Sequence, residues 1–133
     1  MKIATFNINN INERLANLLR WLDAEKPDVV CLQELKTEER GFPAGALRSI
    51  GYEAICVGER SWNGVAILAR EQVQALTRSE LPGDDRDQQA HYVEAAVRGV
   101  LIGCIYLPNG NPSSGTEIQL QTGLVRAPDG ACE

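Results

Sequence analysis

Glu34 lies near the end of the stretch around which the chain is organised, PDVVCLQELK at residues 27–36. A short apolar run after a proline indicates a buried strand that is covered on both faces. In open α/β sheets, ligands bind beyond the carboxyl ends of strands, and a carboxylate there offers oxygen to a hard cation such as Mg²⁺. The plain alternative is an ordinary exposed residue at a strand end, and this stretch alone favours that alternative.

A second polar side chain, Asn7, falls near the end of another expected strand. Residues 2–8 are rich in β-forming types and predict the first strand. Four leucines at helical spacing follow, and the helix should end near Glu25, because the residue before Pro27 avoids helical geometry. Asn10 stands three residues before Glu13, an arrangement like a capping box at the helix start.

This strand–helix–strand order predicts two parallel strands joined by a right-handed crossover. The carboxyl ends of the two strands, which carry Asn7 and Glu34, would then lie side by side. That convergence favours a binding site more strongly than either residue does alone.

Tyr106 is the third candidate. Residues 91–97 and 100–106 predict a strand pair about an Arg98-Gly99 turn, and a tight loop rich in Pro, Asn and Gly follows. A phenol at this strand end, beside exposed amides, has the chemistry to donate a hydrogen bond to a phosphate oxygen. A strand terminus with turn residues explains the same pattern without any function.

The remaining segments predict a mixed α/β domain. Residues 44–50 predict a short helix that ends at Gly51, and residues 52–57 and 65–69 predict a hairpin with Trp62 and Asn63 at its tip. Residues 72–80 predict an edge strand or an irregular segment. The charged stretch at residues 82–89 predicts a surface loop.

The composition limits the class of protein. The chain has 133 residues, of which 44% are hydrophobic, and this is enough for one domain with a packed core. Its formal charge of −5 gives no overall basic field, so nucleic-acid binding would need a local basic patch. A metal-dependent nuclease remains compatible with this balance, because its own site is acidic.

The cysteines and the N-terminus indicate a reducing compartment. The four cysteines form no C-x-x-C pair, and buried free thiols are expected rather than a zinc site or a disulfide framework. The first residues show no signal-peptide pattern, and no apolar run approaches the length of a membrane span. A cytoplasmic location is therefore expected.

Four segments, TFNINNI, PDVVCLQELK, WNGVAILAR and IYLPNGNP, resemble in order the exonuclease III family of the endonuclease/exonuclease/phosphatase superfamily. The resemblance covers roughly residues 1–115. It implies the N-terminal half of a four-layer, deoxyribonuclease I-like α/β sandwich, with a mixed sheet flanked by helices. It also implies a monomeric, Mg²⁺-dependent DNA-repair nuclease, with Mn²⁺ as a substitute, that removes nucleotides from 3′ ends of double-stranded DNA and cuts at abasic sites.

The resemblance assigns roles residue by residue. Asn7 and Glu34 match the family's metal-site asparagine and metal-ligand glutamate, and Tyr106 matches its catalytic-site tyrosine. Asn63 and Asn109 match, more weakly, loop positions near the DNA backbone. His91 stands where the family usually has arginine, and it does not match the family's catalytic histidine, which comes from near the end of a longer chain.

The family's remaining catalytic groups, an Asp-x-Asn motif and a late Asp and His, belong to a second half that this sequence lacks. We therefore expect the chain to be inactive and poorly stable, with the inner face of one sheet lacking its partner. A non-catalytic remnant is one alternative. A superfamily phosphatase or phosphodiesterase acting on a substrate other than DNA is another.

The tail at residues 116–133 departs from the family and is treated as aberrant. Synonymous codons for TEIQLQTGLVRAPDGACE, shifted by one base, can encode PKFNYKLAWFERLMAHA, which resembles the family's continuation. The hypothesis is a one-base insertion near codon 116, either a real frameshift or a sequencing error.

Overall fold

The first sheet carries the strand pair that the sequence predicts. The computed structural model describes residues 1–58, 63–70, 74–76, 91–107 and 124–126. Its first sheet has the order β1-β2-β4-β3. The strands are β1 (Ile3–Asn7), β2 (Val29–Gln33), β3 (Glu53–Val57) and β4 (Val65–Ala69). β1 and β2 are parallel and the other pairs are antiparallel, so the predicted crossover and hairpin are both confirmed.

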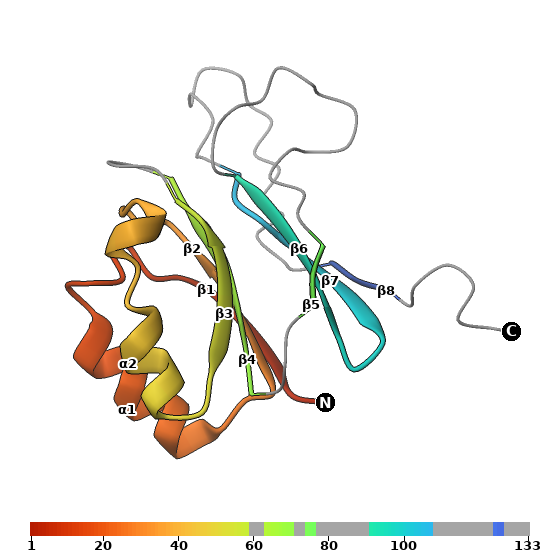
Figure 1. Cartoon of the computed structure of the whole chain (residues 1–133), viewed down its shortest axis with the longest axis horizontal. Helices are drawn as coiled ribbons and strands as arrows, with labels where there is room; N and C mark the ends of the chain where they lie inside the picture. The colour runs from red at the N-terminus through yellow and green to blue at the C-terminus, as the bar shows by residue number, and fades with distance from the viewer. Residues whose placement is uncertain (59–62, 71–73, 77–90, 108–123, 127–133) are drawn as a thin grey trace, which may run out of the picture.

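Helices cover one face of this sheet. They are α1 (Leu15–Glu25), α2 (Ala44–Ser49) and a single 3-10 turn, η1 (Glu39–Gly41). α2 ends where Gly51 takes a φ of +91°, a conformation that suits glycine, as the sequence predicted. Figure 1 shows α1 and α2 together on the side of the sheet that faces away from the remaining strands.

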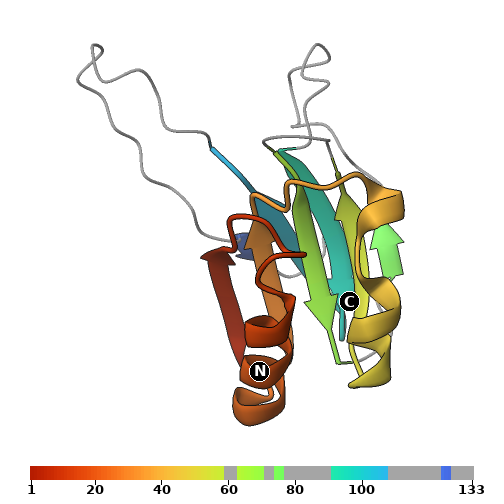
Figure 2. The ribbon, with the colours of Figure 1, turned by 90° about the vertical axis from the view of Figure 1, so that its left-hand side faces the viewer.

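A second sheet packs on the other face. It has the antiparallel order β5-β6-β7-β8, and the turn at Arg98 and Gly99 joins β6 to β7 as predicted. The strands are β5 (Gln74–Leu76), β6 (Tyr92–Val97), β7 (Val100–Ile105) and β8 (Leu124–Arg126). β8 lies inside the tail that the sequence analysis treats as aberrant, and it pairs with Leu101–Gly103 of β7. Figures 1 and 2 show the resulting layers of helices, sheet and sheet.

The start of α1 differs from the prediction. The Glu13 N–H donates to Asn10 Oδ1 at 3.3 Å, which is one half of the expected capping box. However, Asn10 has a φ of +81°, and the regular helix begins only at Leu15, after a turn. At the other end, Lys26 adopts the left-handed conformation and stops the helix before Pro27, as predicted.

Two apolar layers hold the domain together. Leu18 and Leu22 of α1 pack on Val30 and Leu32 of β2 in the layer beneath the helices. Between the sheets, the alternate residues of β2 and β4 pack on β6 and β7 in a cluster of buried side chains. That cluster includes Val29, Cys31, Val65, Ile67, Val93, Ala95, Ile102 and Cys104. The expectation of an uncovered inner face is therefore wrong for β2 and β4, because β6 and β7 cover them.

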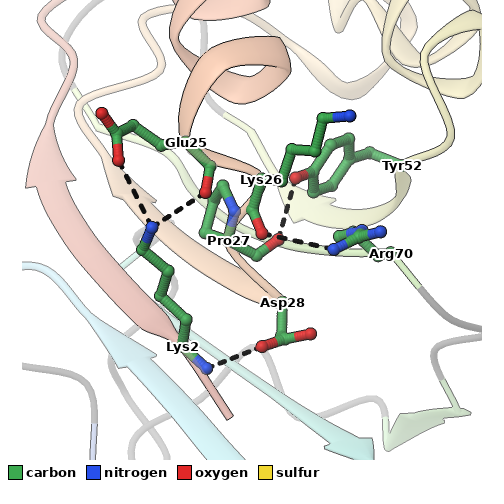
Figure 3. Close-up of polar contacts among 7 residues, drawn as sticks. All are labelled: Lys2, Glu25, Lys26, Pro27, Asp28, Tyr52 and Arg70. Carbon is green, nitrogen blue, oxygen red and sulfur yellow. Dashed lines mark hydrogen bonds and ion pairs between the residues drawn. The ribbon is translucent and has the colours of Figure 1, made fainter.

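Polar contacts secure the end of the sheet where β1 and β2 begin, which is opposite to the end that carries Glu34. The Lys2 main-chain N–H donates to Asp28 Oδ2 at 2.7 Å, and Lys2 Nζ contacts Glu25 (Figure 3). The Tyr52 hydroxyl donates to the Pro27 carbonyl at 2.8 Å. These contacts fix the start of β2 against β1 and α1.

Three thiols are free, as the sequence predicted. Cys31 and Cys104 are buried between the sheets and Cys56 is half-buried, whereas Cys132 lies outside the described residues. Burial raises the pKa of the Cys56 thiol to about 11, so this thiol stays protonated at neutral pH. Among the helices in the described part of the chain, none is long and apolar enough to cross a membrane.

Candidate metal and phosphate site

Glu34 follows the last residue of β2, as predicted, and its backbone is unusual. Its φ is +55°, a left-handed conformation that costs a non-glycine residue free energy and persists only where the surroundings impose it. Two main-chain bonds impose it here. The Asn10 N–H donates to the Glu34 carbonyl at 2.9 Å, and the Ile11 N–H donates to the Leu35 carbonyl at 3.1 Å. The loop after β1 therefore positions the carboxylate at the end of β2.

Tyr106 comes from the other sheet and meets Glu34 directly. Its hydroxyl donates to Glu34 Oε1 at 2.6 Å, a short bond that is typical of a carboxylate acceptor. Burial, and then the Glu34 carboxylate, raise the pKa of the Tyr106 phenol to about 12. The phenol is consequently protonated at neutral pH and is a hydrogen-bond donor.

His91 lies against Tyr106 at the start of β6. The Tyr106 N–H donates to the His91 carbonyl at 2.8 Å. The two rings meet edge to face with their centroids 5.8 Å apart. The sequence comparison set His91 aside as a departure from the family, and the structure places it beside a candidate catalytic side chain.

Asn7 lies at the same end of the sheet, paired in register with Gln33. Its exposed side chain accepts a hydrogen bond from the Asn9 N–H at 3.0 Å through Oδ1. Lys36 Nζ donates to Asn9 Oδ1 at 2.5 Å. The predicted convergence of the strand ends is thus confirmed, and Lys36 lies at the same end of the sheet.

Asn63 contributes through its backbone. The Lys36 N–H donates to the Asn63 carbonyl at 3.0 Å, and the Leu35 N–H donates to the Gly64 carbonyl at 3.2 Å. Gly64 has a φ of +114°, and a Cβ at this position would lie 2.8 Å from Leu35 Cβ. Only glycine therefore allows β4 to brace the loop that carries Glu34. Trp62 and Asn109 lie outside the described residues.

Gln33 is a buried polar residue that the sequence analysis did not name as a candidate. It is 1% exposed, and its Nε2 donates to Thr5 Oγ1 at 2.9 Å and to Cys104 Sγ at 3.5 Å. Its Oε1 has no hydrogen-bond partner within the described part of the chain. The signal was present in the sequence, as a polar residue inside the apolar run of β2.

The oxygen donors at this edge suit Mg²⁺ in type. Mg²⁺ prefers hard oxygen ligands, and it commonly uses one or two protein carboxylates while it keeps several waters. Glu34 offers a carboxylate and Asn7 a side-chain carbonyl. In the described ranges, no three histidine, cysteine or acidic side chains gather into a complete ligand set. Glu34 and Asn7 could therefore supply part of the ligand set of a metal ion.

Comparisons with known proteins agree with this arrangement. Residues 4–131 match the sequence profile of the Endonuclease/Exonuclease/phosphatase family. Exodeoxyribonuclease III of Haemophilus influenzae is 32% identical over 95 residues, which are 71% of this chain and 35% of that protein. DNA repair nuclease APEX1 of Danio rerio is 26% identical over 116 residues, which are 84% of this chain and 37% of that protein. The chain thus spans little more than a third of these relatives.

Solved structures show the same partial coverage. A 3′ phosphatase, NExo, from Neisseria bound to a product DNA hairpin is 37% identical, with a TM-score of 0.74, over 83% of this chain and 42% of that one. An AP endonuclease from Archaeoglobus fulgidus is 36% identical, with a TM-score of 0.75, over 81% of this chain and 41% of that one. The α/β fold that the sequence predicted is therefore confirmed, and the chain belongs to the endonuclease/exonuclease/phosphatase family.

Proposed function

We propose that this chain carries part of the metal and phosphate site of a Mg²⁺-dependent DNA-repair phosphodiesterase of the exonuclease III type. The observation that carries the proposal is the 2.6 Å bond between the Tyr106 hydroxyl and Glu34, at the strand end where Asn7 also lies. It places a carboxylate, an amide and a protonated phenol at one edge of the sheet. The proposed substrate is double-stranded DNA with 3′ ends or abasic sites.

The relatives support this choice of substrate and reaction. Their names describe an exodeoxyribonuclease, a DNA repair nuclease and an AP endonuclease, and one was solved with a DNA hairpin. The oxygen donors of Glu34 and Asn7 support Mg²⁺ as the metal, with Mn²⁺ as a substitute. A cytoplasmic location is also proposed, because free thiols persist in a reducing compartment.

Each side chain has a distinct proposed task. Glu34 and Asn7 would hold the metal, which when bound polarises the scissile phosphate and stabilises the leaving oxygen. When substrate binds, Tyr106 would turn its single O–H from Glu34 to a phosphate oxygen, because its raised pKa keeps the phenol protonated across the neutral range. Asn63 and Asn109 remain weaker proposals for contacts with the DNA backbone.

The chain by itself is proposed to be inactive. It spans about a third of the curated relatives, and the described residues bring together only part of a ligand set. Residues 1–115 are proposed as a partial family domain and residues 116–133 as an aberrant tail. Sequencing the gene across codons 110–135 tests the frameshift hypothesis, which fails if the shifted frame does not encode PKFNYKLAWFERLMAHA.

Metal binding tests the site without relying on activity. Mn²⁺ titrated into the wild-type chain, followed by electron paramagnetic resonance of the free ion, should show saturable binding that Mg²⁺ competes away. Glu34→Gln should weaken that binding at least about tenfold, because it removes the only charged donor of the proposed pair. Glu53→Gln is the matched control, since Glu53 is an exposed glutamate on β3 that pairs with Arg48.

Equal Mn²⁺ binding by wild type and Glu34→Gln would overturn the proposed site. A separate assay on duplex DNA containing one abasic site tests inactivity. The expected result is no cleavage with Mg²⁺, and Mg²⁺-dependent cleavage that Glu34→Gln abolishes would show that the proposed inactivity is wrong.

A further inference from the structure

Gln33, the last residue of β2, is a buried polar side chain at the end of an apolar strand. It lies on the same face of β2 as Val29 and Cys31, which is the face that packs on the second sheet. A buried polar group costs free energy unless it is hydrogen-bonded. Its register partner on β4 is the apolar Val65, which is also fully buried. The contacts of the Gln33 amide are therefore what distinguish this position.

The Gln33 amide contacts three strands. Its Nε2 donates to Thr5 Oγ1 on β1 at 2.9 Å and to Cys104 Sγ on β7 at 3.5 Å. A third acceptor, the Cys31 carbonyl of β2 itself, lies 3.4 Å from Nε2. Thr5 and Cys104 are 28 and 71 positions from Gln33 in the chain. One side chain thus ties β1, β2 and β7 to one another.

Cys104 ties β7 to the end of β2 a second time. Its buried Sγ donates to the Leu32 carbonyl at 3.4 Å. The next two residues after Leu32 are Gln33 and Glu34, and Glu34 accepts the hydrogen bond from the Tyr106 hydroxyl. Three successive residues at this strand end are therefore bonded to side chains from β7 or from the residue that follows it.

Each of the three strands carries a candidate site residue just beyond the tie. The candidates are Asn7 on β1, Glu34 after β2 and Tyr106 after β7. Each candidate follows the residue that takes part in the tie by one or two positions. A strand rises about 3.3 Å per residue, so each candidate lies within about 7 Å of the tie along its own strand. At this range, a shift of one strand against another displaces the site residue with it.

We infer that Gln33 is a positioning residue for the proposed metal and phosphate site, and that its buried amide sets the relative positions of Asn7, Glu34 and Tyr106. In this role Gln33 touches neither metal nor substrate. Side chains that orient the ligands of a metal change its affinity although they do not contact it. The inference rests on the proposed function for the role of the three site residues, but the contacts of Gln33 do not depend on it.

Gln33→Leu tests the inference, because it keeps the approximate volume of the side chain and removes the amide. It should lower the affinity for Mn²⁺ about threefold to tenfold, and less than Glu34→Gln does, since a ligand is displaced rather than removed. It should also lower the pKa of Tyr106 from about 12 toward 10.0, because a displaced Glu34 bonds the phenol less well. Electron paramagnetic resonance of free Mn²⁺ measures the affinity, and the ¹³Cζ resonance of Tyr106 measures the titration.

Two variants of Thr5 test the tie from its other end. Thr5→Val keeps the shape of the side chain and removes the hydroxyl that accepts from Gln33. It should weaken Mn²⁺ binding in the same direction as Gln33→Leu but less, because the contact with Cys104 remains. Thr5→Ser keeps the hydroxyl and should bind Mn²⁺ as the wild type does. The effects of Gln33→Leu and Thr5→Val should be less than additive in the double variant, because both remove the same bond.

Tyr52→Phe is the control for a merely structural effect. It removes a buried hydrogen bond to the Pro27 carbonyl at the opposite end of the sheet. It should change neither the Mn²⁺ affinity nor the pKa of Tyr106, whatever it does to stability. Equal changes of both quantities in Tyr52→Phe and Gln33→Leu would overturn the inference, because general destabilisation would then explain them.

The outcomes separate this inference from the proposed function. If Glu34→Gln weakens Mn²⁺ binding but folded Gln33→Leu keeps both the affinity and the pKa of Tyr106, the inference is wrong and the proposed site stands. If wild type and Glu34→Gln bind Mn²⁺ equally, the proposed site fails. The Tyr106 titration then decides, and an unchanged pKa in Gln33→Leu overturns the positioning role as well. Should Gln33→Leu not fold, wild-type values of both quantities in Thr5→Val would overturn it.

Discussion

The hydroxyl of Tyr106 lies 2.6 Å from Glu34 Oε1 and joins the carboxyl ends of β7 and β2, which belong to different sheets. The two residues are 72 positions apart in the chain. A bond of this kind both positions the carboxylate and ties the two sheets together. Its loss should therefore be visible in stability as well as at the site.

Tyr106→Phe should lower the free energy of unfolding by about 1 kcal/mol at neutral pH, through loss of the bond to Glu34. The substitution should also change how the free energy of unfolding depends on pH in the alkaline range. The pKa of Tyr106 is raised from 10.0 to about 12 in the folded chain. The stability that this shift provides is complete below pH 10.0 and is lost as the pH rises toward 12.

Denaturant unfolding at several pH values between 8 and 12 measures this, and phenolate absorbance follows the titration itself. Tyr52→Phe is the control, because the Tyr52 hydroxyl donates to the Pro27 carbonyl at the opposite edge. If the wild type and Tyr106→Phe lose stability in parallel above pH 10, the coupling between Tyr106 and Glu34 is absent.

Gly64 is expected to be intolerant of any side chain. Gly64→Ala forces a Cβ to within 2.8 Å of Leu35 Cβ at a φ of +114°, so it combines a clash with backbone strain. We expect a loss of about 2–4 kcal/mol. Gly51→Ala is the matched control, because Gly51 also has a positive φ, +91°, but a Cβ there would meet nothing within 4 Å. It should cost only about 1 kcal/mol.

Urea unfolding of the two variants separates the clash from the strain. The Mn²⁺ affinity of the folded Gly64→Ala chain should also fall, because the loop that it displaces carries Glu34. Equal destabilisation by Gly64→Ala and Gly51→Ala would show that β4 does not brace this loop.

The sequence predicted the parts of this site that depend on strand order. The crossover between β1 and β2 follows from apolar periodicity and Pro27, and it predicts that Asn7 and Glu34 lie at the same end of the sheet. The stacking of the two sheets did not follow, because it depends on a buried cluster whose members, such as Ile67 and Ile102, are distant in sequence. The strand end before the loop rich in Pro, Asn and Gly singled out Tyr106, the resemblance gave it a role, and the structure joins it to Glu34.

Backbone conformation was beyond sequence reasoning. Glu34 and Lys36 both take a positive φ although neither is glycine, and hydrogen bonds with the loop after β1 and with the residues just before β4 hold this segment in place. The helix start was misjudged for a similar reason. Asn10 takes a positive φ to bond Glu34, so α1 begins only at Leu15.

Replacing Gln33 by leucine and by alanine should have different effects on stability. Its side chain is buried between the sheets with Nε2 bonded to Thr5, while Oε1 has no partner in the described part of the chain. Gln33→Leu should change the free energy of unfolding by less than about 1 kcal/mol, because it removes an unsatisfied buried acceptor at similar volume. Gln33→Ala should cost about 2–4 kcal/mol through the cavity that it leaves.

Thermal and urea unfolding of both variants provide the measurement. A large loss in Gln33→Leu would mean that the hydrogen bonds of the Gln33 amide, including those from Nε2 to Thr5 and Cys104, stabilise the interior. Equal losses in the two variants would also rule out a cavity as the cause.

Asp28 should govern stability in acid. The Lys2 N–H, bonded to Asp28 Oδ2 at 2.7 Å, lowers the pKa of this carboxyl below its ordinary 3.8, and Arg98 adds to the effect from the turn of the second sheet (Figure 3 shows the Lys2 contact). A lowered pKa in the folded chain favours the folded state above pH 3.8, and this contribution is lost as the pH falls through the lowered value. Asp28→Asn should therefore be less stable than wild type at neutral pH, and the difference should shrink in acid.

Urea midpoints measured from neutral to acid pH test this, with Asp23→Asn on the exposed face of α1 as the control. A difference between wild type and Asp28→Asn that does not change with pH would show that the carboxylate's charge does not secure the start of β2.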